Sequence, residues 1–149
     1  MDLVFAFEAT ISLAPINDLG KTPIGHRRII DIVSGTVTGP KLQGEILPGG
    51  ADWQYIRDDD VTFLDARYTI KTVDEALIYV NNRGYRHGPA EVMERMKKGE
   101  PVEDASYYFR CTPWFETSAP KYGWLNKTIF VASGARDPEA VRLAFFEVT

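Results

Sequence analysis

The residues best suited to chemistry are Asp65 and Arg67, two positions apart on a strongly alternating stretch. Side chains two residues apart on an extended strand point to the same face, so this carboxylate and this guanidinium are predicted neighbours. An arginine beside a carboxylate lowers its pKa and can also clamp an anionic or carbonyl group. Tyr68 points to the opposite face, so the three residues share a pocket only if a bulge redirects one of them.

A second group lies between residues 105 and 117, where Tyr108 and Arg110 share a face and Glu116 follows. Asp65 or Glu116 is predicted to act as a general base, while Arg67, Arg110 or Tyr108 stabilises developing negative charge. Flat aromatic side chains can form the walls of a ligand pocket. The predicted ligand contacts are Trp53, Tyr68, Tyr108, Trp114, Trp124 and Asn126.

An alternative explanation is a structural network of ion pairs with aromatic packing. Charges stand beside apolar or aromatic strand residues at Asp52, Asp65, Arg67, Arg110 and Glu116. A buried charge without a partner costs several kcal/mol, so any of these that points inward must pair or bind something.

The elements that position these residues are mostly strands. In residues 3–13 every second residue is apolar, which predicts a long strand whose apolar face carries Leu3, Phe5, Phe7, Ala9, Ile11 and Leu13. Residues 15–23 are predicted to form a loop. Further strands are predicted at 27–38, 41–47, 52–57, 61–72, 76–83, 105–117, 128–135 and 141–148.

The central stretch 39–68 is rich in glycine and proline, and these residues predict barrel corners at Gly39-Pro40 and Pro48-Gly49-Gly50. Gly35, inside a predicted strand, indicates a bulge or a corner. Residues 89–98 change to a helical period, which predicts one short helix that caps a barrel mouth or packs against its wall.

Together these elements predict a mostly β protein, a single antiparallel β-barrel of about eight to ten strands with one short helix, in one domain covering residues 1–149. Lipocalin-like or allene-oxide-cyclase-like barrels have this form. Closure removes the exposed sheet edges that long apolar strands otherwise leave.

Composition excludes several classes of function. The formal net charge is −4 and the basic residues are dispersed, which disfavours nucleic-acid binding. No apolar run is long enough for a transmembrane helix, and the first residues are better explained as a strand than as a signal peptide, so a cytoplasmic protein is expected. Cys111 is the only cysteine and is predicted to be a buried small hydrophobe.

No metal or cofactor site is predicted. His26 and His87 are far apart in the chain, each beside an arginine, and are expected to be exposed. The glycines of GPKLQG and PGG match neither a Walker loop nor a Rossmann fingerprint. Asp58-Asp59-Asp60 is predicted to be a solvated hairpin end rather than a cation site.

Several segments, in this order, resemble an uncharacterised bacterial and fungal family, domain of unknown function 3237. They are GPKLQGEILPGGADW, LDARYTI, NNRGYR, YYFRCTPWFET, YGWLN and FVASGAR. The resemblance extends from Phe5 to Val148 and implies a single-domain antiparallel β-barrel with a central cavity. It carries no catalytic residues that can be transferred to this chain.

Three functions are compatible with such a barrel. The first is a cofactor-independent enzyme, an isomerase, cyclase or lyase, that transfers protons on a small aromatic or polyketide-like carbonyl compound. The second is a non-catalytic carrier or sensor of hydrophobic ligands, with a dry apolar cavity. The third is a structural subunit of an oligomer, with no cavity. A small hydrophobic or aromatic ligand and a possible homodimer are the expected partners, with no membrane or nucleic acid.

Overall fold

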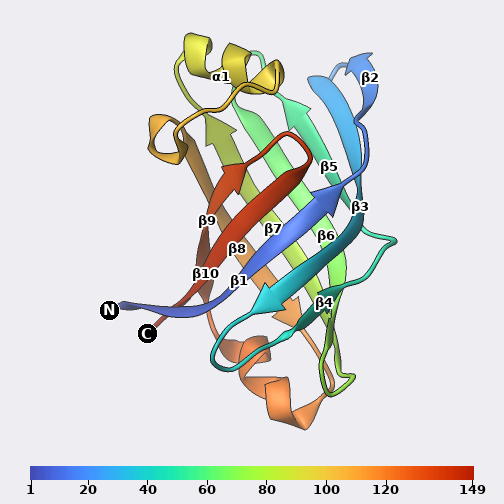
Figure 1. Cartoon of the computed structure of the whole chain (residues 1–149), viewed down its shortest axis with the longest axis vertical. Helices are drawn as coiled ribbons and strands as arrows, with labels where there is room; N and C mark the ends of the chain where they lie inside the picture. Colours follow the sequence, from blue (N-terminus) through green and yellow to red (C-terminus); the bar gives the residue numbers. More distant parts are fainter.

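The computed structural model describes all 149 residues and contains ten strands in one antiparallel sheet (Figure 1). No helix has the length and apolar character needed to cross a membrane. The elements are β1 (Leu3–Leu13), β2 (Asn17–Lys21), β3 (His26–Thr38), β4 (Gly44–Ile46), β5 (Ala51–Ile56), β6 (Thr62–Thr72), β7 (Leu77–His87), α1 (Ala90–Lys97), η1 (Asp104–Ser106), β8 (Tyr108–Glu116), η2 (Pro120–Lys127), β9 (Phe130–Arg136) and β10 (Ala140–Val148), where η denotes a 3₁₀ helix.

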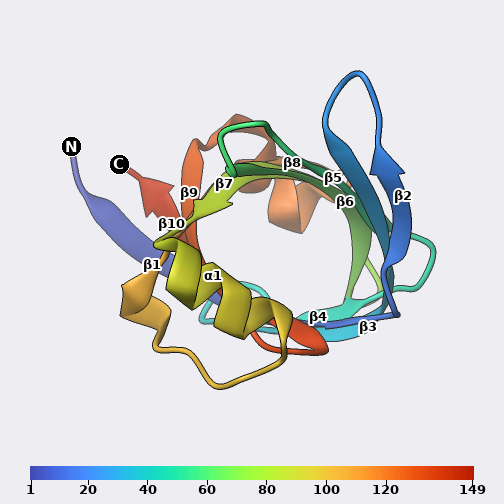
Figure 2. The ribbon, with the colours of Figure 1, turned by 90° about the horizontal axis from the view of Figure 1, so that it is seen from above.

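The sheet closes on itself because β1 pairs with β10 on one side and with β3 on the other. The order around the ring is β1-β10-β9-β8-β7-β6-β4-β3, and β5 also bridges β3 and β6. Seen from above, the strands surround a central axis, with α1 at this end (Figure 2). The prediction of a closed antiparallel barrel is confirmed.

One place in the ring is shared by two short strands. β4 pairs with one part of β3 and β6, and β5 pairs with another part of the same two strands. The segment between them contains the predicted Pro-Gly-Gly corner. Gly49 has a φ of +106°, a conformation that favours glycine, and a Cβ on Gly50 would lie 2.3 Å from the carbonyl oxygen of Arg67. The ring therefore has eight strand positions, one of them broken by this corner.

The first strand differs from its predicted pattern. A bulge between Phe5 and Phe7 shifts the pairing of β1 with β10, so Ala6 and Phe7 are both buried. Leu3 and Phe5 consequently lie on the outside, 61% and 43% exposed, where Phe5 contacts Phe146 edge-on. The prediction that Leu3 and Phe5 share the buried face of Phe7 is wrong because a bulge exchanges the two faces of a strand.

Two other segments also differ from or refine the predictions. Residues 17–21, predicted as loop, form β2, which pairs with the first residues of β3 outside the ring. The helix predicted at 89–98 is present as α1, and Gly99 follows it with a φ of +74°, the conformation of a helix C′ residue. Met93 and Met96 pack against the barrel core from this helix.

The bulge gives a direct test of the β1 register. Phe7 is fully buried and stacks on Phe145 with ring centroids 4.5 Å apart. We expect Phe7→Ala to lower the free energy of unfolding by about 3–5 kcal/mol, because it leaves a cavity in the core. Phe5→Ala, the matched control on the same strand, is expected to cost only about 1 kcal/mol. Urea denaturation measures both, and equal losses would contradict the bulge.

Candidate functional site

The inner and outer faces of β6 settle which of the central residues can meet a ligand inside the barrel. Leu64, Ala66 and Tyr68 line the interior, whereas Asp65 and Arg67 lie on the outer face, joined by a 3.4 Å ion pair. Arg67 is mostly exposed to solvent. Tyr68 is therefore the residue of this group that remains beside the cavity.

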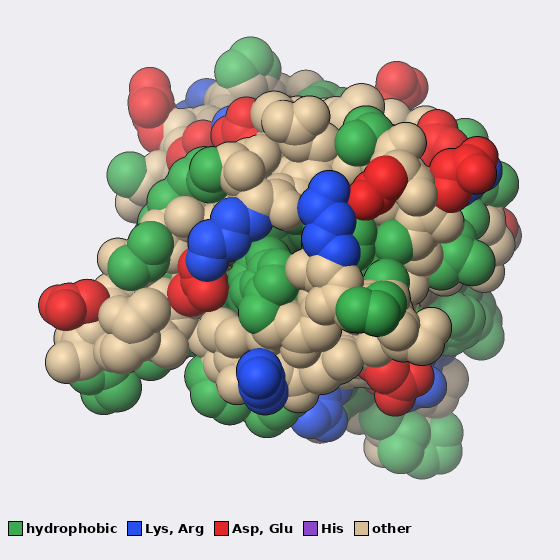
Figure 3. All heavy atoms as spheres, turned by 90° about the horizontal axis from the view of Figure 1, so that it is seen from below, with side chains coloured by type: hydrophobic (Ala, Val, Ile, Leu, Met, Phe, Trp, Pro, Cys, Tyr) green, Lys and Arg blue, Asp and Glu red, His purple; other side chains and the backbone are tan.

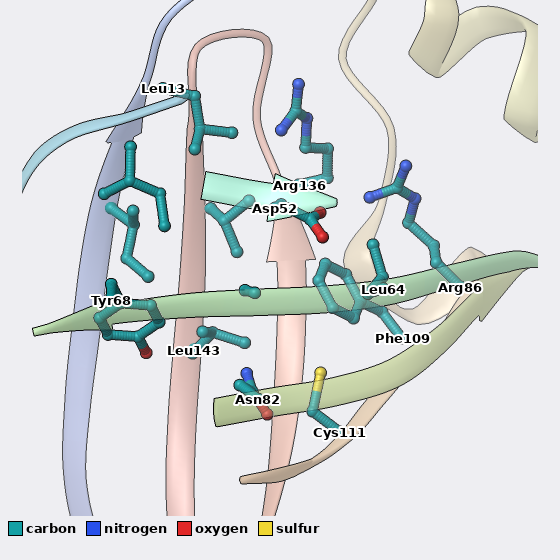
Figure 4. Close-up of a pocket in the computed structure, with 14 residues that line it drawn as sticks. Leu13, Asp52, Leu64, Tyr68, Asn82, Arg86, Phe109, Cys111, Arg136 and Leu143 are labelled. Carbon is teal, nitrogen blue, oxygen red and sulfur yellow. The ribbon is translucent and has the colours of Figure 1, made fainter. Parts of the chain in front are cut away.

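The barrel encloses a small cavity with a volume of about 40 Å³ (Figure 4). A buried water needs roughly 10–15 Å³ by this kind of measure, so the space takes a few waters or a compact ligand. Ten of the fourteen lining residues are hydrophobic. The lining consists of Ile11, Leu13, Ile32, Asp52, Leu64, Ala66, Tyr68, Asn82, Arg86, Phe109, Cys111, Arg136, Val141 and Leu143.

The strand register orders the polar groups along the barrel. Asp52 and Asn82 are both paired with Ala66, so they lie on neighbouring strands at one level. Arg86 is four residues further along β7, toward the end that carries α1, and Tyr68 lies on the other side of the Asp52 level. Arg136 ends β9 on the α1 side. Arg86 and Arg136 thus lie near the upper mouth of the cavity. The Asp52 carboxyl and the Asn82 amide lie below them, and the Tyr68 phenol lies deepest.

Asp52 is held in place by hydrogen bonds from two directions. The Asp65 backbone N–H donates to Asp52 Oδ1 at 3.0 Å, at a break in the β5–β6 ladder. Gln54 Nε2 donates to Asp52 Oδ2 at 2.7 Å, and Arg28 fixes Gln54 by donating twice to its Oε1 at 2.9 and 2.6 Å. These contacts leave the carboxyl at the edge of the cavity, with protein on its other sides.

Burial is the dominant influence on Asp52 and raises the pKa of its carboxyl above the ordinary value. The two donated hydrogen bonds and the positive charges of Arg86 and Arg136 act in the opposite direction but do not cancel it. A carboxyl whose pKa is raised toward neutrality is better matched to accepting and returning a proton than an ordinary surface aspartate.

Arg86 is an unusual arginine because it is only 5% exposed and its guanidinium makes no hydrogen bond or ion pair within the chain. Its Nε is fully buried without a partner, and the guanidinium carbon lies 5.6 Å from the centroid of the Phe109 ring. Burial, followed by the charges of Arg136 and Arg28, lowers the pKa of Arg86 to about 10. Buried polar groups are normally paired, so this one indicates a missing partner.

The charges around the upper part of the cavity do not balance. Arg136 is half-buried, and its guanidinium also makes no hydrogen bond in the protein. Burial lowers the pKa of both Arg136 and Arg28, and the charge of Arg28 lowers that of Arg136 further. Asp52 is the only acidic residue that lines the cavity, where Arg86 and Arg136 are the two basic ones. The site is therefore electropositive.

Two more polar atoms without partners lie below the arginines, Asn82 Oδ1 at the level of Asp52 and Tyr68 Oη deeper, on side chains only 4% and 3% exposed. Burial raises the pKa of Tyr68 well above its ordinary value, so the phenol stays protonated and can donate a hydrogen bond. Burial also raises the pKa of the Cys111 thiol to about 12, which makes it a poor nucleophile. Cys111 is the small buried residue that the sequence predicts.

The lower end of the barrel is closed by η2, which buries Tyr122 and Leu125. Asp74 ties η2 to β6, since it accepts hydrogen bonds from Tyr122 Oη and Thr72 Oγ1, both at 2.6 Å. Figure 3 shows this end, where hydrophobic side chains are visible at the centre and both basic and acidic side chains lie around them. A ligand would consequently enter from the opposite end.

Most of the site residues predicted from sequence lie away from the cavity. Arg110 and Glu116 are on the outer face of β8, and Tyr108 and Trp114 are 47% and 55% exposed on the same face. Trp53 is also outside. None of these five lines the cavity.

Two further predicted ligand contacts belong to the closed lower end. Trp124 packs partly against the core, with Lys41 Nζ 4.8 Å from its ring centroid. Asn126 is exposed and exchanges hydrogen bonds with the Thr117 backbone. Tyr68 is thus the one predicted ligand contact at the cavity.

Sequence reasoning missed Asn82, Arg86 and Arg136, and treated Asp52 only as a charge on an apolar strand. The sequence signal that could have found Arg86 is that residues paired across neighbouring strands point to the same face of the sheet. Phe109 and Cys111 are apolar neighbours on one face of β8, and Arg86 is paired directly with Phe109 in the ladder.

Comparison with known proteins agrees with this architecture. Residues 1–148 match the model of the family described as Protein of unknown function (DUF3237). The chain belongs to this family. Relatives include the UPF0311 protein of Bradyrhizobium diazoefficiens, 43% identical over 99% of this chain and 97% of that protein. A UPF0311 protein of Clostridium acetobutylicum is 45% identical over 85% of this chain and 80% of its own.

Several solved structures share the barrel. A conserved protein of unknown function from Rhodopseudomonas palustris has a TM-score of 0.94 at 39% identity, covering 99% of this chain and 97% of that one. A beta-barrel like protein from Acinetobacter baumannii has a TM-score of 0.87 at 42% identity, covering 99% and 96%. An enzyme from Penicillium herquei has a TM-score of 0.74 at 20% identity, covering 99% and 94%, and so shares the fold.

Removing the unpaired charge of Arg86 tests whether the site is built for a ligand at the expense of stability. We expect Arg86→Met to raise the free energy of unfolding of the ligand-free protein by about 1 kcal/mol or more, because a methionine fills similar space without burying a charge. The control is Arg142→Met, which removes an exposed arginine paired with Asp137 at 2.8 Å and is expected to change stability by less than about 1 kcal/mol. A loss of about 2 kcal/mol or more for Arg86→Met would contradict the unpaired charge.

The raised pKa of Asp52 predicts a specific dependence of stability on pH. Between the ordinary pKa of an aspartic acid and the raised pKa in the folded state, the folded protein binds more protons than the unfolded chain. The contribution of Asp52 to stability is therefore present at low pH and lost as the pH rises through this window. Urea denaturation of the unsubstituted protein and of Asp52→Asn, from about pH 4 to 7, isolates this term because other groups cancel. The free energy of unfolding of the unsubstituted protein minus that of Asp52→Asn should fall as the pH rises. A rise with pH would show instead that the pKa of Asp52 is lowered in the folded state.

Proposed function

We propose that this protein is a small-molecule-binding barrel enzyme that transfers a proton on a small carbonyl compound, as an isomerase, cyclase or lyase does. The observation that carries the proposal is the position of Asp52. Its carboxyl borders an otherwise mostly apolar cavity, its pKa is raised by burial, and an unpaired arginine lines the same cavity. A base beside a group that stabilises an oxyanion is what enolisation requires.

The proposed step uses two side chains. The Asp52 carboxylate removes a proton from the carbon next to the carbonyl group. The electron pair of that C–H bond moves into a C=C bond, and the carbonyl π electrons move to oxygen, giving an enolate. The Arg86 guanidinium donates hydrogen bonds to this oxygen, and Asp52 returns the proton to the same or another carbon. The chemistry is that expected from the sequence, with Asp52 and Arg86 in place of the residues on the outer faces.

The rest of the cavity supplies orientation and a suitable environment. Tyr68 Oη, at the deep end, would donate a hydrogen bond to a second oxygen of the ligand, and Asn82 Oδ1 would accept one from a ligand hydroxyl. Apolar walls strengthen the electrostatic interaction between Arg86 and the enolate because they exclude water. The volume of about 40 Å³ favours a compact carbonyl compound, and an aromatic one would require side chains at the mouth to move outward.

A carrier or sensor of small hydrophobic ligands is the second candidate, and the mostly hydrophobic lining favours it. A purely apolar carrier leaves Asp52 and Arg86 unexplained, since burying them costs stability. A structural subunit with a filled barrel leaves the cavity itself unexplained.

Exchange of carbon-bound hydrogen with deuterium from D₂O tests the enzyme proposal before a natural substrate is found. Small ketones, hydroxyketones and oxo acids are incubated with the protein, and loss of the ¹H NMR signal next to the carbonyl is followed. We expect at least one compound to exchange faster than in buffer, and Asp52→Asn to lower that enzymatic rate by about 10²-fold or more.

Asp58→Asn is the matched control, because Asp58 is an exposed aspartate paired with Lys21 outside the cavity, and its substitution should leave the rate unchanged. Equal rates for the unsubstituted protein and for Asp52→Asn would contradict the proposal. Binding of a compound without exchange of any would favour the carrier.

A further inference from the structure

The proposed step does not account for one feature of the cavity, the arginines at its upper mouth. Arg136 lines the cavity at the end of β9, and Arg28 stands near it at the start of β3. Proton transfer by Asp52 and Arg86 does not use Arg136, and it uses Arg28 only to hold Gln54 against Asp52. The charges of Arg136 and Arg28 raise the cost of keeping Arg86 charged, so a purely neutral substrate gives no reason for Arg136.

Each of these arginines lacks a full set of protein partners. The Arg136 guanidinium makes no hydrogen bond, although its own backbone N–H is fixed by Tyr107 Oη at 2.8 Å. Arg28 uses Nε and Nη2 on Gln54, and its Nη1 makes no hydrogen bond. The nearby carboxylate of Asp137 is engaged by Arg142 at 2.8 Å. Asp18, near Arg28, accepts from the His26 ring at 2.6 Å.

The balance of charge points to the class of ligand. Of the residues that line the cavity, Arg86 and Arg136 are cationic and Asp52 is anionic when ionised, which leaves one positive charge in excess. Proton transfer moves the negative charge of Asp52 to the enolate oxygen at Arg86 and leaves the total unchanged, so the excess charge calls for a second negative group near Arg136. Carboxylates match guanidinium donors in geometry and charge, and such charge-assisted hydrogen bonds are strong.

We propose that the substrate is a short-chain oxo acid whose carboxylate binds Arg136, with Arg28 alongside, while its carbonyl oxygen lies at Arg86. This inference rests on the proposed function for the role of the carbonyl, but the carboxylate site stands on the arginines themselves. The small cavity agrees with a short chain, because the charged end remains at the mouth and only a few atoms reach the level of Asp52.

Equilibrium binding of matched acids and esters tests the carboxylate site. Acetoacetate and 2-oxobutyrate are titrated into the intact protein by calorimetry, each beside its uncharged methyl ester. The acids should bind at least about tenfold more tightly than the esters. Arg136→Met should weaken binding of the acids by about tenfold or more and leave binding of the esters nearly unchanged. Thermal melting verifies that each variant is folded.

Two further variants sharpen the test. Arg67→Met removes an exposed arginine on the outer face and should leave acid binding unchanged. Arg136→Lys keeps a charge but loses the forked donors, so it should recover part of the affinity. Equal affinity for acids and esters, or acid binding that is insensitive to Arg136→Met, would overturn the inference. Failure of both acids to bind at millimolar concentration would also overturn it.

Asp52→Asn separates this inference from the proposed function. It should abolish deuterium exchange while leaving acid binding unchanged or tighter, because a competing negative charge is removed. If neutral ketones exchange in an Asp52-dependent manner and the acids do not bind, the carboxylate site is wrong and the enzyme proposal stands. If the acids bind through Arg136 and nothing exchanges, the proton-transfer function is wrong and the anion site stands.

Discussion

Closure of the sheet through β1 is the constraint on which the rest of the molecule depends. This strand pairs with β10 along one edge and with β3 along the other, so the strands of the ring have no free edge and their inner faces surround one interior. Water cannot reach polar groups there through a sheet edge. Each inward-facing polar atom must therefore find a partner in the protein, bind water or a ligand, or remain unpaired at a cost in stability.

The interior contains polar groups that are hydrogen-bonded within the protein and polar groups that are not. Asp52 is fixed by the Asp65 backbone and by the relay from Arg28 through Gln54, so its position does not depend on a ligand. Arg86, Tyr68 and Asn82 each retain an unpaired buried atom. A preorganised carboxyl facing unpaired hydrogen-bonding groups is typical of a site that exchanges stability for binding or catalysis.

The sequence predicts the architecture well because a two-residue period and glycine-proline corners are local signals. The strand pattern follows from the two-residue period, the corner at Pro48-Gly49-Gly50 from its proline and glycines, and the short helix from a helical period. β2 was missed because NDLGK has little strand propensity and is extended through its pairing with β3. The bulge at Phe5–Phe7 was missed because residues 3–7 are all apolar, so an exchange of faces there leaves no mark in the sequence.

The site was harder to predict, because alternation says which residues share a face and not which face is inside. The grouping of Asp65 with Arg67, opposite Tyr68, is correct, and the closed ring decides that Tyr68 faces inward. Arg86 and Arg136 stand near strand ends, where a charged side chain looks solvent-exposed in sequence. They lie near Asp52 only because β5, β7 and β9 curve around the same axis, a relation that no local pattern contains.

The central claim is that Asp52 is a cavity carboxyl whose pKa is raised by burial. A pH titration of the aspartate side-chain carboxyl ¹³C signals, with Asp52 assigned by comparison with Asp52→Asn, measures this directly. The account predicts a midpoint for Asp52 clearly above about 3.9, the ordinary value for aspartate, with a chemical-shift change at the same pH for Arg86 Nε. A midpoint at or below that value would contradict the account, because it would describe a carboxylate held by an ion pair and not a base poised for proton transfer.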